Sequence, residues 1–185
     1  MDIFSHHIWW YDIIRHPSAK KLIKYAKPQK TDIVLDIGGG TGVIAEALKP
    51  FVKTISVLDQ SAEMLKYAKK RGVRTILGSA NSIPFRPRTV DMIVCTDAFH
   101  HMQDQLTILR EMRRVLKPYG RLIIEEIDPG TVNGKIVKCV EWILGCNSKF
   151  HRPKNLVRLL KKCGFTTKII DKDAGSYLVR ATPRI

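Results

Sequence analysis

Residues 34–42 have the sequence Val34-Leu35-Asp36-Ile37-Gly38-Gly39-Gly40-Thr41-Gly42, a short apolar run that leads into a glycine-rich turn. The run predicts a buried strand, and the apolar spacing beyond the turn predicts a helix that stops at Pro50. A glycine turn between a strand and a helix lets a ligand approach the backbone closely. In a doubly wound sheet the first such turn lies beside the point where ligands bind.

Strands and helices alternate along the rest of the chain. Apolar runs predict strands at residues 32–37, 54–58, 74–77, 90–96 and 121–127. Helical spacing in the segments between them predicts crossover connections and therefore a parallel sheet. Two final strands, 166–170 and 176–182, have no helix between them and predict a hairpin. We expect an α/β fold, a doubly wound and mostly parallel sheet of seven strands, the last antiparallel, with helices on both faces.

The composition is that of one globular domain spanning residues 1–185. Apolar residues make up 44% and charged residues 26%, and no apolar run approaches the roughly 20 residues that cross a bilayer. The chain begins Met1-Asp2 without a basic segment or cleavage site, so we expect a cytoplasmic protein. The four cysteines form no C-x-x-C pair, and we interpret them as buried thiols rather than zinc ligands.

The charge is the unusual feature of the composition. Lys and Arg number 32 and Asp and Glu number 17, a formal net charge of +15. Such an excess favours contact with nucleic acid, acidic lipid or an acidic small molecule. A solvated basic surface without a partner is the alternative.

The N-terminal residues 1–27 combine an aromatic cluster, at residues 6–12, with a basic amphipathic helix. Three interpretations remain open. The segment is a lid over an acceptor pocket, a helix packed on the sheet, or an interfacial anchor on acidic membrane.

The spacing of the glycines distinguishes between ligands. A dinucleotide fingerprint would need its third glycine at position 43, where this chain has Val43. The observed D-x-G-x-G-x-G pattern from Asp36 to Gly42 resembles motif I of the class I S-adenosylmethionine (SAM)-dependent methyltransferases. The resemblance implies SAM as cofactor, with Asp36 helping to hold its cationic aminoacyl end and with the turn glycines around it: Gly38, Gly39, Gly40 and Gly42.

Two further segments extend the resemblance. Asp59 ends the next predicted strand, where the resemblance implies that it accepts the ribose hydroxyls; its alternative is to cap the helix beside Ser61. Residues 78–85 resemble the family's G-D-A-x-x-L-P-F segment around the adenine, with Ser79 in place of the usual acid. The other residues expected around the cofactor are Gln60, Met64, Ala80, Asn81 and Thr96.

The following segment resembles one branch of the family. Residues 90–101 and 116–122 are similar to the D-x-V-x-x-x-x-x-L-H-H and L-K-P-G-G-x-L signatures of small-molecule methyltransferases of the ubiquinone and menaquinone biosynthesis type. Phe99 and Tyr119 depart from those signatures. The resemblance covers about residues 31 to 128, and beyond Thr131 it is architectural. The place of the helix at residues 131–150 after the fifth strand makes it a candidate substrate wall.

Two histidines are candidates for proton transfer. His101 is the better candidate for a general base, and His7 is the second. We expect no metal, because the adjacent His100 and His101 should point in different directions at a strand end and no third ligand has clear spacing.

The sequence as a whole predicts a SAM-dependent methyltransferase that acts on a small-molecule acceptor. A lipophilic acceptor and peripheral contact with acidic membrane would suit the lid and anchor interpretations. Nucleic acid is disfavoured, because no N-P-P-Y turn follows the fourth strand and no cysteine follows a proline. The alternatives are a non-catalytic SAM-binding sensor or scaffold, and an RNA methyltransferase, which the net charge would suit.

Overall fold

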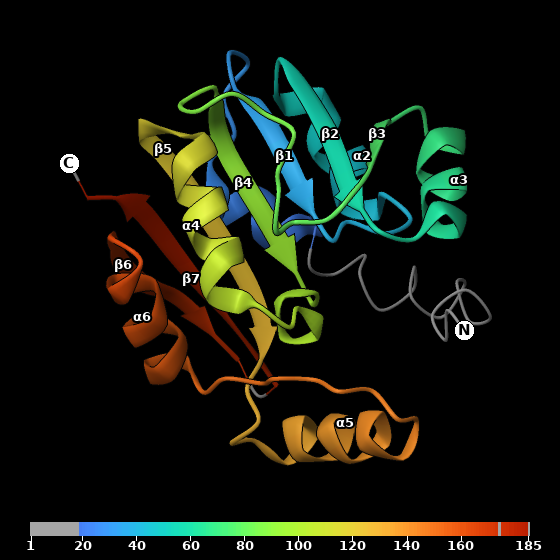
Figure 1. Ribbon diagram of the computed structural model, residues 1–185, viewed down its shortest axis with the longest axis vertical. Helices are drawn as coiled ribbons and strands as arrows, with labels where there is room; N and C mark the ends of the chain where they lie inside the picture. Colours follow the sequence, from blue (N-terminus) through green and yellow to red (C-terminus); the bar gives the residue numbers. More distant parts are fainter. Residues whose placement is uncertain (1–18, 174, 185) are drawn as a thin grey trace.

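The computed structural model describes residues 19–173 and 175–184 (Figure 1). Seven strands form one sheet of order β3-β2-β1-β4-β5-β7-β6. The strands are β1 (Ile33–Ile37), β2 (Thr54–Asp59), β3 (Arg74–Leu77), β4 (Val90–Thr96), β5 (Leu116–Ile127), β6 (Phe165–Lys172) and β7 (Ser176–Pro183). The helices are α2 (Val43–Leu48), α3 (Ala62–Lys70), α4 (Gln105–Val115), α5 (Val132–Ile143) and α6 (Pro153–Lys162), with short 3₁₀ turns η2 (Lys49–Phe51) and η3 (Phe99–His101).

The predicted architecture is confirmed. Strands β1 to β5 pair in parallel, and β7 pairs antiparallel with both β5 and β6. Because β1 lies between β2 and β4, the chain reverses its direction across the sheet there, and the crevice at the carboxyl ends of these strands is the expected ligand site.

Helices cover both faces of the sheet, and the sheet separates the core into two layers. Helices α4 and α6 lie in front of the sheet in Figure 1, and α2 lies behind it with the helical residues 19–26. Ala19, Leu22 and Ala26 are buried against the back face. Lys21 extends from this helix to Asp171 and Asp173, at 2.9 Å from a carboxylate oxygen of each. Residues 1–18 lie outside the described part of the chain, and with them the aromatic cluster of the predicted lid or anchor.

Three local expectations differ from the structure. Strand β5 begins at Leu116, within the predicted helix, because the β4–β5 register shifts between Val90 and Met92 and admits Pro118 and Gly120 to the strand. The predicted helix at residues 131–150 is shorter, at Val132–Ile143. Of the thiols that we expected to be buried, Cys139 is exposed and Cys146 is partly exposed; all four are free. Among the described residues, no helix is long and apolar enough to cross a bilayer.

Candidate functional site

A cavity of about 630 Å³ opens at the carboxyl ends of β1, β2 and β4. One end is bounded by the glycine turn and the start of α3, and the other by η3 and the residues that follow it. Eight residues of the predicted cofactor set line it: Gly38, Gly40, Asp59, Gln60, Met64, Ser79, Ala80 and Asn81. A volume of this size suits a ligand such as a nucleoside-linked amino acid.

The backbone of the glycine turn lies very close to β2 and to the residues that follow β4. Gly38, Gly40 and Gly42 all have positive φ angles, a region that side chains disfavour. The Gly38 N–H donates to the carbonyl of Leu58 at 2.8 Å, which joins the turn to β2. A Cβ on Gly38 would lie 2.6 Å from the Cβ of Ala98, so any side chain there would disturb the wall of the cavity.

Asp59 connects the turn to α3. Its Oδ2 accepts a hydrogen bond from the Gly40 N–H and its Oδ1 accepts one from the Ser61 N–H, each at 2.9 Å. The Ser61 hydroxyl in turn caps α3 by accepting from the Met64 N–H. Asp59 therefore supports the start of α3, as one of its two expected roles requires. Its side chain also lines the cavity, where the other expected role, binding the ribose, would place it.

Four predicted cofactor residues lie behind the wall of the cavity. Asp36 is fully buried, and a Cβ on Gly39 would lie 2.5 Å from its carboxylate carbon, so the missing side chain of Gly39 leaves the space that Asp36 fills. Gly42 begins α2 and packs on Ala68, and Thr96 is buried at the end of β4. These four residues shape the wall, and a direct contact with cofactor stays a prediction for each.

The segment expected around the adenine is held by α4, a support that the motifs did not reveal. Glu111 accepts from the Ile83 N–H, and Arg114 donates to the carbonyls of Ile83 and Phe85. The Ser79 hydroxyl accepts from the Asn81 N–H at 3.2 Å, which closes a tight turn at the cavity wall. Glu111 and Arg114 form an ion pair and lie three residues apart on one face of α4. This spacing is visible in the sequence and could have predicted the ion pair.

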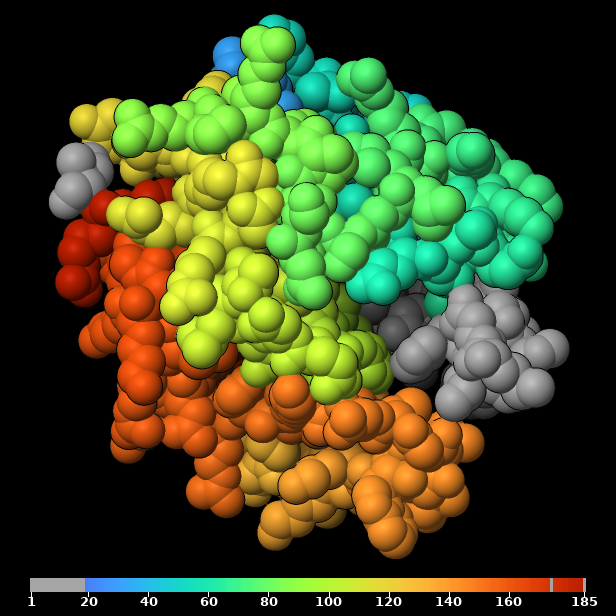
Figure 2. Space-filling model, in the orientation of Figure 1, coloured from blue at the N-terminus to red at the C-terminus, as the bar shows by residue number. Residues whose placement is uncertain are grey.

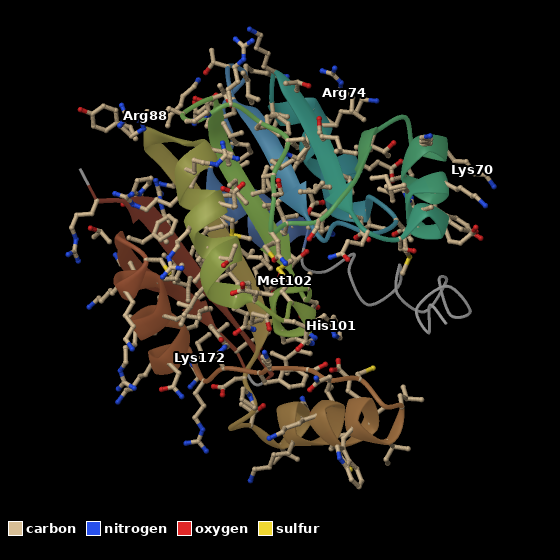
Figure 3. The ribbon with its side chains drawn as sticks, in the orientation of Figure 1. Lys70, Arg74, Arg88, His101, Met102 and Lys172 are labelled. Atoms are coloured by element: carbon tan, nitrogen blue, oxygen red, sulfur yellow. The ribbon has the colours of Figure 1, made fainter. Side chains whose placement is uncertain are left out.

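The two adjacent histidines have different environments. His101 lines the cavity and is partly exposed, and its Nδ1 lies 3.1 Å from the Ser148 hydroxyl. His100 is buried, and its ring stacks on Phe150. Figure 3 shows His101 and Met102 between the carboxyl end of β4 and α5. The expectation that the two rings diverge is wrong, because the 3₁₀ turn brings their centroids to 4.0 Å.

Two glutamates surround His100. The Nδ1 of His100 lies 2.7 Å from Glu126, and its Nε2 lies 3.3 Å from Glu141 of α5. Burial by itself lowers the pKa of His100, but the two carboxylates outweigh burial and raise that pKa to about 10. His100 is therefore a cation at neutral pH, and it joins β5 and α5 across the end of β4.

The fold brings a third potential metal ligand, Glu141, close to the two histidines, which the sequence did not indicate. His100, His101 and Glu141 each offer one ligand atom, and these atoms lie within 4.8 Å of one another. A divalent cation could bridge such a group. The positive charge of protonated His100 already offsets the negative charge of the Glu141 carboxylate. The absence of a metal stays a prediction. His7, the other candidate base, lies outside the described residues.

Sequence reasoning missed several residues of the cavity, chiefly those after β4: Asp97, Ala98, Met102 and Gln103. Their position in the chain could have identified them, because residues that directly follow a parallel strand at the switch point lie at the edge of the sheet where ligands bind. Asp97 has a left-handed φ of 45°, which turns the chain sharply from β4 into η3. The remaining lining residues are Ile37, Leu58, Ser61, Gly78 and Ile108, so among the described residues α5 does not contribute the substrate wall that was expected of it.

The strand order, the glycine turn at the switch point and the acid at the end of β2 define the class I methyltransferase fold. Residues 35–124 match the family model of a methyltransferase domain. A demethylmenaquinone methyltransferase of Thermotoga maritima is 40% identical over 113 residues, which cover 59% of this chain and 48% of the relative. One of Lactococcus lactis is 27% identical over 91% of this chain and 77% of the relative.

A solved structure extends the likeness to the whole fold. A SAM-dependent methyltransferase from Thermotoga maritima superposes with a TM-score of 0.83 at 23% identity, over 98% of this chain and 99% of that one. Residues 35–124 thus have the sequence of a methyltransferase domain, and the chain is similar in sequence and in fold to SAM-dependent methyltransferases, among them a demethylmenaquinone methyltransferase. The chain spans about half the length of the Thermotoga maritima relative by sequence.

Proposed function

We propose that this protein transfers the methyl group of SAM to a small, lipophilic acceptor. The observation that carries the proposal is one continuous cavity whose wall runs from the glycine turn and Asp59 to His101 and Met102. The cofactor end is formed by predicted SAM ligands, and the far end combines an imidazole with the apolar side chain of Met102. The names of the quinone-biosynthesis relatives support a small-molecule acceptor.

The residues present fit the cofactor. The absence of side chains at Gly38 and Gly40 opens the turn to it, and the Asp59 carboxylate suits its ribose hydroxyls. Ser79 to Asn81 would contact the adenine. Bound SAM would supply a methyl group activated by its sulfonium: the acceptor nucleophile would bond to the methyl carbon as the carbon–sulfur bond breaks in line, and S-adenosylhomocysteine would leave.

The chain contributes mainly by positioning. Holding donor and acceptor at attack distance can lower the barrier by roughly 7–11 kcal/mol. An acceptor that is already anionic, or neutral and basic, then needs no base. Where a proton must leave, His101 would accept it; the proposal is supported by its position on the cavity wall, with Ser148 at its Nδ1.

The test is transfer of labelled methyl from SAM into a cell extract that is then separated into lipid, RNA, protein and small-molecule fractions. The matched control is Gly40→Val, which places a β-branched side chain at a φ of +54° on the cavity wall. Label in the lipid or small-molecule fraction, absent from the control, supports the proposal.

The alternatives predict different results. Label in the RNA fraction would identify an RNA methyltransferase, and SAM binding with no label in any fraction would favour a sensor or scaffold. We propose the cytoplasm as the compartment, which the four free thiols support.

A further inference from the structure

In the described part of the chain, the exposed apolar side chains are concentrated on one helix. Among the described residues, twelve large apolar side chains are exposed, and six of them lie between residues 132 and 144: Val132, Ile136, Val140, Trp142, Ile143 and Leu144. Trp142 is 77% exposed and Ile143 is 70% exposed. Helix α5 lies at the lower end of the molecule in Figure 1, and Figure 2 shows its segment at the surface there. A patch of this kind marks an interaction surface.

The orientation of α5 is the reverse of that of an ordinary surface helix. Its inner side is formed by buried Gly134 and by the partly buried Val137 and Glu141. Gly134 packs against the backbone of Asp128 and Pro129, and Glu141 contacts His100. At 100° per residue these inner positions lie opposite Val132, Ile136 and Ile143, so the side that faces solvent is the apolar one.

The charges around this apolar side have one sign. Residues 129–162 contain eight Lys and Arg and one acidic residue, Glu141, which is turned inward to His100. Lys135 and Lys138 lie on α5 itself, on the same flank of the helix as Trp142, and both are exposed. An apolar side with flanking lysines and a tryptophan is the composition of a helix that lies in a membrane interface.

We propose that α5 docks the protein on an anionic lipid surface, with its axis in the plane of the interface and Val132, Ile136, Val140 and Ile143 inserted among the acyl chains. Nucleic acid fits less well, because the centre of the face is aliphatic and offers no hydrogen bond. A second copy fits less well because each chain carries a net charge of +15 and the two would repel. The docking does not depend on the proposed reaction.

The experiment is sedimentation of the full chain with vesicles of neutral phosphatidylcholine, or of phosphatidylcholine with phosphatidylglycerol at about 7:3. The apolar variant is Ile136→Ser with Ile143→Ser, and its control is Tyr119→Ser, an 88% exposed residue of β5. The charge variant is Lys135→Gln with Lys138→Gln, and its control is Lys69→Gln with Lys70→Gln on α3. All sites are exposed, so each variant should keep the wild-type fold, which circular dichroism checks.

We expect the wild type to bind the anionic vesicles and the apolar variant to bind them at least about tenfold more weakly. The charge variant should lose roughly fivefold per lysine on anionic vesicles and little on neutral ones. Both controls should bind as the wild type does. Equal binding by the apolar variant and the wild type, or no binding by the wild type, would overturn the proposal. Loss of RNA binding or of self-association in the apolar variant, with vesicle binding intact, would overturn it too.

Discussion

Gly42 shows how a single motif residue serves two constraints. It precedes α2 with a φ of +79°, and a Cβ there would lie 2.9 Å from the Cβ of Ala68 on α3. The first constraint is local, and it could be anticipated from a glycine between a strand and a helix. The second is a contact between two helices that only the folded chain reveals.

We expect Gly42→Ala to destabilise the protein by more than conformational strain alone. Gly145→Ala is the matched control, because Gly145 has a φ of +76° and nothing lies within 4 Å of its Cβ position. The control should cost about 1 kcal/mol of unfolding free energy, and Gly42→Ala should cost about 1–3 kcal/mol more. Denaturant unfolding of both variants measures the difference. Equal losses would mean that the contact with Ala68 relaxes without cost.

His101 is the residue whose role in chemistry is most open to direct test. If it accepts a proton from the acceptor, His101→Gln should lower turnover by about 10²–10⁴-fold and leave SAM affinity close to that of the wild type. Steady-state kinetics with the acceptor, together with calorimetric SAM binding, separates the two effects. Gln103→Ala, also on the cavity wall, is the control. Unchanged turnover across about pH 6 to 9 in the His101 variant would exclude the base.

At the scale of elements, α5 is held by very few contacts. Its one buried residue is Gly134, where a Cβ would overlap the backbone oxygen of Asp128. Helix propensity and tertiary structure therefore make opposite predictions for this position. Alanine is a better helix former than glycine by about 1 kcal/mol, but here its side chain would force α5 away from the sheet.

We expect Gly134→Ala to speed amide hydrogen exchange in residues 132–143 while the amides of β1 and β4 exchange as in the wild type. Asn133→Ala, at the exposed neighbouring position, is the control and should not speed exchange in the helix. Slower exchange in α5 of the glycine variant would show that propensity outweighs the overlap with Asp128.

At the scale of the whole molecule, the ion pairs of His100 make stability depend on pH. The pKa of His100 rises from about 6.5 in the unfolded chain to about 10 in the folded one. The folded state therefore keeps a proton that the unfolded state has lost between these values. The stabilisation is present in full below pH 6.5 and is lost as the pH rises toward 10.

The free energy of unfolding should fall between about pH 7 and pH 8.5, with a limiting slope of about 1.4 kcal/mol per pH unit. In His100→Gln the slope should be smaller, because the titrating group is gone. Urea unfolding across this range measures both slopes, and the thiols of Cys146 and Cys163, whose pKa values are raised by burial, contribute to both alike, so the difference between the slopes belongs to His100. Parallel curves would mean that His100 is not protonated between its two carboxylates.

The sequence by itself determined the sheet, and with the family resemblance it implied the cofactor and indicated part of the cavity wall. Strand and helix periodicities are local properties that a sequence displays directly, and the cofactor is what the resemblance of the glycine turn and of the following acid to the SAM-dependent methyltransferases implies. The first and last residues of β3 and β4 agree with the prediction. Eight of the residues expected to contact the cofactor line the cavity.

Only the tertiary structure decided what surrounds those residues. It placed Asp36 behind the wall and Asp59 on it, although both lie near the carboxyl ends of neighbouring strands. It also brought Glu141 to His100 from forty-one positions away and turned the apolar side of α5 outward. A periodic pattern shows that a helix has an apolar side but not what that side faces, because its direction depends on contacts between distant parts of the chain.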